Sequence, residues 1–331
     1  MPVAMITPEG LIRSQGPYVS MLQEAGFDVI YPKDTTFTRG QHTFEQHVET
    51  LKDVEGLIAG GEILSEKVLE SLPKLRVIAR SGVGFDKVDV AACTKFGKVL
   101  TITPTANHAA VAEHALSLLF AISKEVLFND EEARAGRWPM KPTYPIRGKT
   151  ICIVGLGRIG RSMAERSLAL GMKVIAVEQY PNKEFVEKHG IELVDMDGMV
   201  ELSDIVSIHC PLMPETKHLF NKSVFSRMKE GSILINTARG PIVKEDDLID
   251  ALRNGPLMAA GLDVFEVEPV KMDNPVFQLK NVVVSPHIGG SDTKSQEDMG
   301  IEAADCIIQL KDGTWPAAAV INQDVQEGWT W

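Results

Sequence analysis

Short apolar runs alternate with amphipathic segments along most of the chain. Runs such as residues 3–6, 56–59 and 77–80 are bounded by turn residues, which is typical of buried strands. Segments with apolar residues at helical spacing lie between these runs. Strands that alternate with helices form parallel sheets covered by helices on both faces. The predicted strands of the first part are 3–6, 28–31, 56–59, 77–80 and 98–102, and its predicted helices are 17–25, 44–51, 66–72 and 87–96.

The alternation is interrupted after residue 102, where Thr103-Pro104-Thr105 indicates a linker. A long helix that Asn107 can cap is expected to run to about residue 129, followed by a proline-containing excursion over 136–147. The alternation then resumes. A final helix over 293–310 and the tail are expected to return to the first unit, because chain ends commonly lie close together. The predicted strands of this second part are 150–154, 173–177, 191–194, 205–209, 232–236, 258–263 and 282–285, and its predicted helices are 161–170, 183–188, 196–202, 222–228 and 244–253.

We therefore predict an α/β protein with two doubly wound parallel-sheet domains and an interdomain cleft. The first domain comprises residues 1–103 plus 291–331, and the second comprises residues 104–290. In this arrangement one domain holds a cofactor, and the substrate is expected in the cleft.

A glycine-rich turn follows the strand at 150–154, and a helix follows the turn. Gly155, Gly157 and Gly160 have the spacing G-x-G-x-x-G. The first glycine permits a tight turn, the second lets a pyrophosphate approach the backbone, and the third lets helix and strand pack closely. The free N–H groups at the start of the helix favour phosphate. This context predicts a dinucleotide site, whereas the motif alone is also compatible with a turn that binds nothing.

Glu178 ends the next predicted strand, 23 residues after Gly155. An acidic residue at this distance can bind the ribose hydroxyls of the adenosine. Its charge repels a 2′-phosphate, and Gln179 and Tyr180 offer no compensating positive charge. The sequence therefore predicts NAD rather than NADP.

Composition limits the classes of protein. The 331 residues are 44% hydrophobic and 24% charged, with a formal net charge of −11. These values indicate a globular protein and argue against nucleic-acid and membrane partners. The four cysteines form no C-x-x-C pair, which disfavours a structural metal site or a disulfide framework. No signal peptide is apparent at the N-terminus, and we expect a cytoplasmic protein.

Three polar residues follow strands of the second domain and are candidates for catalysis. Arg239, Glu268 and His287 lie on separate loops that are expected at the same sheet edge as the glycine turn. A histidine can exchange the proton of a hydroxyl group, and a carboxylate can fix its tautomer. A guanidinium can bind a substrate carboxylate and polarise a carbonyl oxygen. Each residue taken singly is also compatible with a surface ion pair, a solvated turn or a buried structural histidine.

Other candidate positions have weaker support. The turn Ser81–Asp86, SGVGFD, follows a strand, and the N–H groups of Val83 and Gly84 can form an anion site, although a purely structural loop is equally compatible. His209 ends a strand and is expected to form a wall near the nicotinamide. His114 lies within the long helix, and the remaining histidines have no carboxylate partner that the sequence identifies.

With these motifs, the sequence resembles the D-isomer-specific 2-hydroxyacid dehydrogenases over nearly its whole length. The segments that carry the resemblance are SGVGFD, TANHAAVAEHAL, GKTICIVGLGRIG, SIHCPLMPET, INTARGPIVKEDDLIDAL, AAGLDVFEVEP and VVVSPHIGG. The resemblance implies two Rossmann-like domains. The first is a flavodoxin-like substrate domain, and the second binds NAD and forms a homodimer. It further implies hydride transfer between NAD(H) and a small D-2-hydroxy acid or 2-oxo acid.

The resemblance also implies roles for individual residues. Arg239, Glu268 and His287 match the catalytic residues of the family, with His287 as general acid–base, Glu268 as its partner and Arg239 on the substrate. The expected substrate contacts are Val83, Gly84, Asn107, Arg239 and His287. Asp263 is expected near the nicotinamide carboxamide. The expected cofactor contacts are Gly155, Gly157, Arg158, Ile159, Gly160, Glu178, Pro211, Thr216, Thr237, Ala238, Arg239, Asp263, His287 and Val111.

The sequence departs from the family pattern at three places. Glu178 replaces the more frequent Asp and keeps its acceptor role. The chain ends soon after Asn322, so a regulatory domain and serine feedback are not expected. The segment AGGEILS, residues 59–65, has no arginine where phosphoglycerate-binding members often place one, although a basic residue of 137–147 could compensate. The alternatives are a D-3-phosphoglycerate dehydrogenase without a regulatory domain and an NAD-sensing, corepressor-like binding protein.

Overall fold

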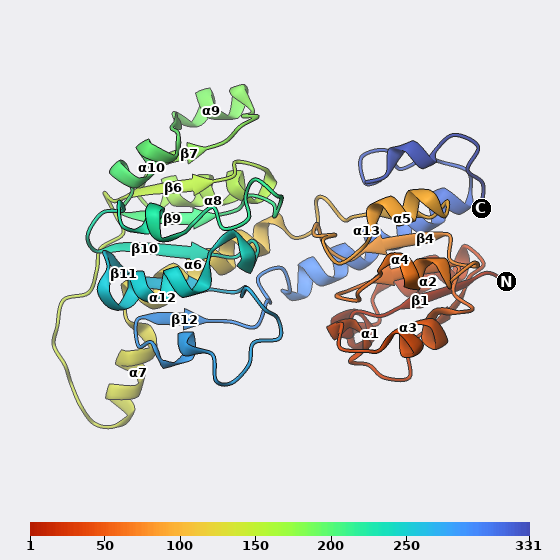
Figure 1. Ribbon diagram of the computed structural model, residues 1–331, viewed down its shortest axis with the longest axis horizontal. Helices are drawn as coiled ribbons and strands as arrows, with labels where there is room; N and C mark the ends of the chain where they lie inside the picture. Colours follow the sequence, from red (N-terminus) through yellow and green to blue (C-terminus); the bar gives the residue numbers. More distant parts are fainter. The chain divides into compact units, whose positions relative to one another are not determined.

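The computed structural model describes all 331 residues, which separate into two compact units. Unit 1 comprises Met1–Asn107 and Gly290–Trp331, and unit 2 comprises His108–Gly289. Each unit contains one sheet with helices around it (Figure 1). All paired strands run parallel, which confirms the predicted fold class. None of the helices combines the length and apolar character that a bilayer-spanning segment needs.

The five strands of unit 1 have the order β2-β1-β3-β4-β5, which is the flavodoxin-like order. A short helix, α1, was absent from the prediction because it spans only Glu9–Ser14, between Pro8 and the left-handed Gln15. The strands are β1 (Val3–Ile6), β2 (Asp28–Ile30), β3 (Gly56–Ala59), β4 (Val77–Arg80) and β5 (Val99–Thr101). The helices are α1, α2 (Pro17–Glu24), α3 (Phe44–Leu51), α4 (Glu66–Glu70), α5 (Val90–Lys95) and α13 (Thr293–Lys311).

Both faces of the unit 1 sheet are covered, so its strands are apolar without interruption. Successive side chains of a strand point to opposite faces. In β3, Leu57 packs with α3, α4 and α5, whereas Ile58 packs with α1, α2 and α13. The helices α2 and α13 approach closely at Gly300, where an added Cβ would lie 2.3 Å from the Tyr18 ring. Residues 290–331 therefore complete the core of unit 1.

The seven strands of unit 2 have the order β12-β11-β10-β9-β6-β7-β8. The direction of strand addition reverses between β6 and β9, and open α/β sheets bind ligands at the carboxyl ends of such strands. The strands are β6 (Thr150–Val154), β7 (Lys173–Val177), β8 (Glu192–Leu193), β9 (Ile205–Ile208), β10 (Ser232–Asn236), β11 (Leu257–Leu262) and β12 (Val282–Val284). The helices are α6 (His108–Ser123), α7 (Val126–Arg134), α8 (Arg158–Ala169), α9 (Lys183–His189), α10 (Met196–Leu202), α11 (Lys222–Phe225) and α12 (Glu245–Asn254).

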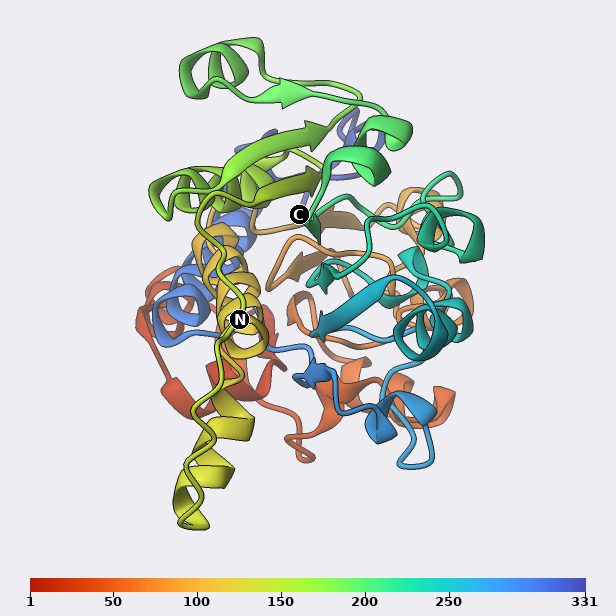
Figure 2. The same ribbon diagram turned by 90° about the vertical axis from the view of Figure 1, so that its left-hand side faces the viewer.

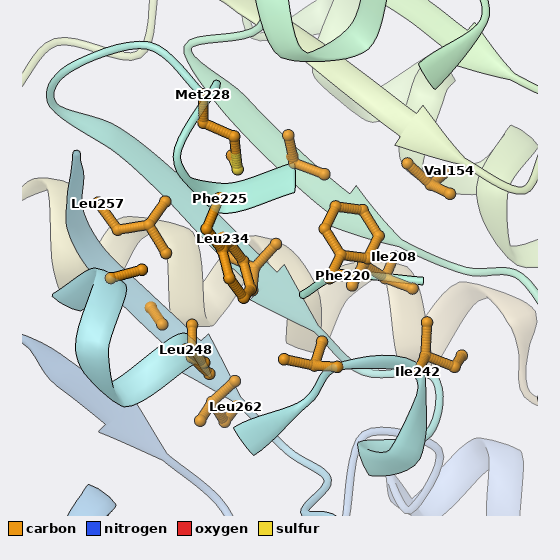
Figure 3. Packing of buried hydrophobic residues seen from close by; sticks show 14 of the residues in the cluster. Val154, Ile208, Phe220, Phe225, Met228, Leu234, Ile242, Leu248, Leu257 and Leu262 are labelled. Carbon is orange, nitrogen blue, oxygen red and sulfur yellow. The ribbon is translucent and has the colours of Figure 1, made fainter. Parts of the chain in front are cut away.

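The core of unit 2 also lies on both faces of its sheet. On one face, Ile153 and Ile235 pack against α6 and α8. On the other face, Phe220 and Phe225 pack among strand residues such as Leu234 (Figure 3). Alternate residues of β10 therefore serve different faces, and this burial on both sides holds the loops at its carboxyl edge.

The predicted helix from Asn107 to about residue 129 is wrong in its extent. The structure has two helices, α6 and α7, because Glu125 adopts a left-handed conformation with φ 49° between them. Only α6 packs on the sheet, and no residue of α7 is buried. Both views show α7 and the segment after it extending from the rest of unit 2 (Figures 1 and 2). A helical sequence pattern continues across the break, so the change of direction depends on the backbone at one residue.

Candidate functional site

The turn between β6 and α8 has the geometry of an anion site. Gly155 has φ 96°, and an added Cβ there would lie 2.5 Å from the backbone nitrogen of Cys210. At Gly160 an added Cβ would lie 2.0 Å from the carbonyl oxygen of Gly155. At Gly157, the N-cap of α8, an added Cβ would meet no atom within 4 Å. Two glycines are therefore required by packing, and the third leaves space in front of the helix.

The N-terminus of α8 suits the pyrophosphate of a dinucleotide. Gly157 provides no side-chain hydrogen bond to the cap, and the first turn, which starts at Arg158 and Ile159, has no acidic residue. The N–H groups of this turn and the positive end of the helix dipole can therefore act on an anion. The open space at Gly157 lies where that anion must approach. These features fit a dinucleotide.

Glu178 closes the other side of this turn. Its Oε2 accepts a hydrogen bond from the N–H of Leu156 at 2.6 Å, and its Oε1 accepts one from the N–H of Tyr180 at 2.9 Å. Each carboxylate oxygen has a further lone pair. The carboxylate can thus hold the glycine turn and still accept hydrogen bonds from ribose hydroxyls.

The loop after β9 packs against the glycine turn. Thr216 Oγ1 donates to the carbonyl of Pro211 at 2.7 Å and accepts from the N–H of Met213 at 2.8 Å, which closes this loop. Burial lowers the pKa of His209 to about 4 and raises the pKa of the Cys210 thiol to about 11. Both side chains are therefore uncharged at neutral pH, as suits a wall beside a nicotinamide.

The loop after β10 carries Thr237, Ala238 and Arg239. Asn236 holds this loop, since its Oδ1 accepts from the N–H of Ala238 at 3.0 Å and its Nδ2 donates to the carbonyl of Arg239 at 3.0 Å. Arg239 Nη1 donates to the carbonyl of Ala238 at 2.7 Å. The Thr237 hydroxyl is buried and has no hydrogen-bond partner. An orphan hydroxyl at the carboxyl edge of the sheet is available to a ligand.

The loops after β11 and β12 bring Glu268 and His287 together. His287 Nδ1 lies 2.7 Å from Glu268 Oε2, and Glu268 Oε1 accepts from the N–H of Phe265 at 2.9 Å. The side chain of His287 remains 46% exposed. With Nδ1–H donated to the carboxylate, the imidazole presents Nε2 for proton exchange. The pair has the arrangement of a general acid–base and its orienting carboxylate.

Asp263 lies beneath the His287 loop and is almost fully buried. Its Oδ1 accepts from the Ser285 hydroxyl at 2.6 Å and from the N–H of Ile288 at 2.9 Å. Its Oδ2 accepts from the N–H of Gly289 at 2.8 Å. Sequence reasoning did not identify Ser285. Its position directly before the PHIGG segment was the available signal.

The expected substrate-binding residues Val83, Gly84 and Asn107 belong to unit 1. Gly82 has φ 130°, and Arg80 Nε donates to the carbonyl of Gly84 at 3.0 Å, which shapes the turn after β4. The backbone hydrogen bonds around this turn do not use the N–H groups of Val83 and Gly84. Asn107 is buried with an unpartnered Oδ1. The turn can therefore accept an anion through its backbone.

The helix α6 carries Val111 and His114, and a second histidine outside the predicted site, His218, also contacts a carboxylate. Val111, an expected cofactor contact, is a buried residue of α6. The sequence identifies no carboxylate partner for His218, whereas the structure places its Nε2 2.7 Å from Glu266 Oε1; it also places Nε2 of His114, in the long helix, 3.3 Å from Asp263 Oδ1. These partners are 48 and 149 residues away in the sequence, so spacing alone could not identify them.

The chain is similar in sequence to proteins of a known family. Residues 116–289 match the protein family described as "D-isomer specific 2-hydroxyacid dehydrogenase, NAD binding domain". A glyoxylate reductase of Korarchaeum cryptofilum is 36% identical over 285 residues, which cover 84% of this chain and 86% of the relative. A D-3-phosphoglycerate dehydrogenase of Archaeoglobus fulgidus is 36% identical over 281 residues, which cover 84% of this chain but 53% of the relative. The chain thus spans about half the length of that dehydrogenase.

A solved structure gives the same picture of the fold. The crystal structure of D-lactate dehydrogenase from Aquifex aeolicus, complexed with NAD and lactic acid, aligns with a TM-score of 0.83 at 26% identity. The alignment covers 97% of this chain and 99% of that chain. Unit 2 contains an NAD-binding domain, and the prediction of NAD as cofactor is confirmed.

Proposed function

Because this chain belongs to the D-isomer-specific 2-hydroxyacid dehydrogenase family, we propose that it transfers hydride between NAD(H) and a small D-2-hydroxy acid or its 2-oxo acid. The observation that carries the proposal is the contact of 2.7 Å between His287 Nδ1 and Glu268 Oε2. Glu268 follows β11 and His287 follows β12. Both strands belong to the same sheet as β6, the strand that precedes the glycine turn. When bound, the nicotinamide accepts or supplies the hydride.

The residues of the chain handle the proton and the substrate charge. In the direction of oxidation, His287 Nε2 accepts the hydroxyl proton as hydride leaves C2 of the substrate. Glu268 stabilises the imidazolium that results, since its carboxylate faces Nδ1. Arg239 binds the substrate carboxylate and stabilises the charge on the C2 oxygen. The N–H groups of Val83 and Gly84 are proposed as further donors to a substrate carboxylate. In the direction of reduction, His287 returns the proton to that oxygen.

An unphosphorylated substrate fits the residues of unit 1 best. The segment 59–65 has no basic residue, and it contains Glu62, whose carboxylate is fully buried and has no hydrogen-bond partner. The segment therefore supplies no positive charge that could pair with a phosphate. The proposal therefore favours a small 2-oxo acid over phosphohydroxypyruvate.

The test is oxidation of NADH with a panel of 2-oxo acids. The panel comprises glyoxylate, hydroxypyruvate, pyruvate, longer and branched acids, and phosphohydroxypyruvate. Saturable turnover of one or more unphosphorylated acids is the expected result. Turnover of phosphohydroxypyruvate alone would show that the substrate is phosphorylated, as the relatives named phosphoglycerate dehydrogenase suggest. NADH binding without turnover of any acid would refute the enzymatic proposal and favour a binding protein.

We also propose that the protein is a homodimer formed through unit 2. The helix α7 and the segment after it expose large apolar side chains, among them Leu127, Phe128, Trp138 and Met140. Exposed apolar side chains gathered on an extended arm favour burial against a second chain. Light scattering after size-exclusion chromatography is expected to give twice the mass of one chain of 36.3 kDa. The variant W138E is expected to shift this mass toward the monomer, and a wild-type monomer would refute the proposal.

A further inference from the structure

The loop that carries His287 is held by Asp263 through three successive backbone N–H groups. The N–H of His287 donates to the carbonyl of Asp263 at 2.8 Å. The N–H groups of Ile288 and Gly289 donate to the carboxylate of the same residue at 2.9 and 2.8 Å. His287 itself has φ 55°, a conformation that costs free energy in a residue with a side chain. The Asp263 carboxylate therefore compensates for a strained backbone at the proposed acid–base.

The orientation of this carboxylate depends in turn on Ser285 and His114. Ser285 Oγ lies 2.6 Å from Asp263 Oδ1 and 2.7 Å from His114 Nε2. A serine hydroxyl has one proton, which Ser285 gives to Asp263. The contact with His114 must then be donated by the histidine, so His114 Nε2 carries a proton. The hydrogen bonds therefore run in one direction, from His114 on α6 through Ser285 to Asp263.

The loop that carries His287 also packs directly on the side chains of Asp263 and His114. An added Cβ at Gly289 would lie 2.9 Å from Asp263 Oδ2 and 3.4 Å from His114 Cδ2. His114 thus contacts the region from α6, an element on which none of the proposed catalytic residues lies. Removing its N–H would leave Ser285 free to rotate away from the carboxylate.

We infer that His114 is a positioning residue of this enzyme: its Nε2–H orients Ser285, which orients Asp263, which sets the backbone from which His287 meets Glu268. The inference rests on the proposed role of His287. It assigns to His114 no contact with substrate or cofactor. It explains why a buried carboxylate, a hydroxyl and an imidazole converge beneath this loop.

The test compares H114L with H114Q and with the control H189L. His189 is a suitable control because its side chain is 19% exposed, against 20% for His114, and it also lies on a helix with one acidic neighbour. We expect H114L to lower kcat about 10-fold, which is the order of effect that follows from the loss of one orienting hydrogen bond. The Kd for NADH, measured by fluorescence, should stay within about twofold. H114Q retains an N–H donor and should recover most of kcat, and H189L should resemble wild type.

A double-mutant cycle and amide exchange add independent readouts. Because His114 Nε2 also lies 3.3 Å from Asp263 Oδ1, H114L combined with S285A should lower kcat further than S285A alone, but by less than the product of the two single losses. Exchange of the Ile288 and Gly289 amides, followed by NMR, should accelerate in H114L and not in H189L. Additive losses, no rescue by H114Q, or unchanged exchange would each overturn the inference. If no 2-oxo acid is turned over by the wild type, the proposed function fails, and exchange alone decides whether His114 positions the loop.

Discussion

Replacement of Glu268 by glutamine is expected to lower kcat by two to four orders of magnitude without disturbing the fold. In the wild type, Oε1 accepts from the N–H of Phe265 at 2.9 Å and Oε2 faces His287 Nδ1 at 2.7 Å. Glutamine can keep the first contact only through its carbonyl oxygen. Its NH₂ group must then face Nδ1, which has to act as acceptor. His287 would carry its proton on Nε2, the atom that is proposed to receive the substrate proton.

The magnitude follows from two effects. A hydrogen bond to a charged group contributes about 1.5–3 kcal/mol, or roughly a 10- to 150-fold change in rate. The unfavourable tautomer adds to this loss, and a comparable exchange behind a serine-protease histidine costs about 10⁴-fold. For E268Q we therefore expect a loss of about 10²- to 10⁴-fold in kcat at neutral pH.

The assay is steady-state oxidation of NADH with the best 2-oxo acid, together with direct titration of NADH. The matched control is E266Q, since Glu266 also lies 2.7 Å from a histidine, His218, with a positive φ of 53°. We expect E266Q to keep kcat within about twofold of wild type, because we assign His218 no catalytic role. E268Q activity above half that of wild type would refute the tautomer argument. Equal losses of kcat in E266Q and E268Q would show that the effect comes from a disturbance of the loop after β11 and not from the contact between Glu268 and His287.

Three further outcomes are expected. G157A should keep the wild-type Tm but weaken NADH binding at least tenfold, whereas G160A should lower both, since its Cβ would lie 2.0 Å from a carbonyl oxygen; equal effects would contradict this distinction. R239Q should raise KM for the 2-oxo acid and lower kcat with little change in the Kd for NADH, and an effect on NADH alone would contradict the assignment. The pKa of His209 is lowered to about 4, against about 6.5 in an unfolded chain, so the unfolded state binds the extra proton between these values. The neutral, buried His209 therefore makes its full contribution to the free energy of unfolding above about pH 6.5, and this contribution is lost as pH falls through about 4. H209Q should reduce the change in the free energy of urea unfolding over this pH range by up to about 3 kcal/mol. An unchanged dependence of that free energy on pH would contradict this prediction.

Much of the fold follows from local patterns in the sequence. A strand buried on both faces must be apolar without interruption, so runs such as Ile151–Val154 are visible in one dimension. The glycine turn is visible for a similar reason, because a positive φ at Gly155 and a close approach at Gly160 exclude side chains. The fold class and the cofactor are therefore confirmed predictions. Arg239, Glu268 and His287 could be nominated because functional side chains follow the carboxyl ends of parallel strands.

The break between α6 and α7 was not predictable in the same way. The helical pattern of apolar and polar residues continues through Lys124 and Glu125, and neither residue is a strong helix breaker. The chain turns because Glu125 takes a left-handed conformation, after which α7 leaves the sheet. Local propensity does not specify where packing on the sheet ends.

The sequence by itself determined the elements, the glycine turn and the residue types at the ends of the strands. These properties depend on neighbours along the chain, on the period of a strand or helix, and on space for a Cβ. Only the tertiary structure decided the partners of the polar side chains. It paired His287 with Glu268 and His218 with Glu266, although the two carboxylates are two residues apart. It also joined His114 to Ser285 across 171 residues. A hydrogen bond requires a distance and a direction in space, and both are set by the packing of whole strands and helices.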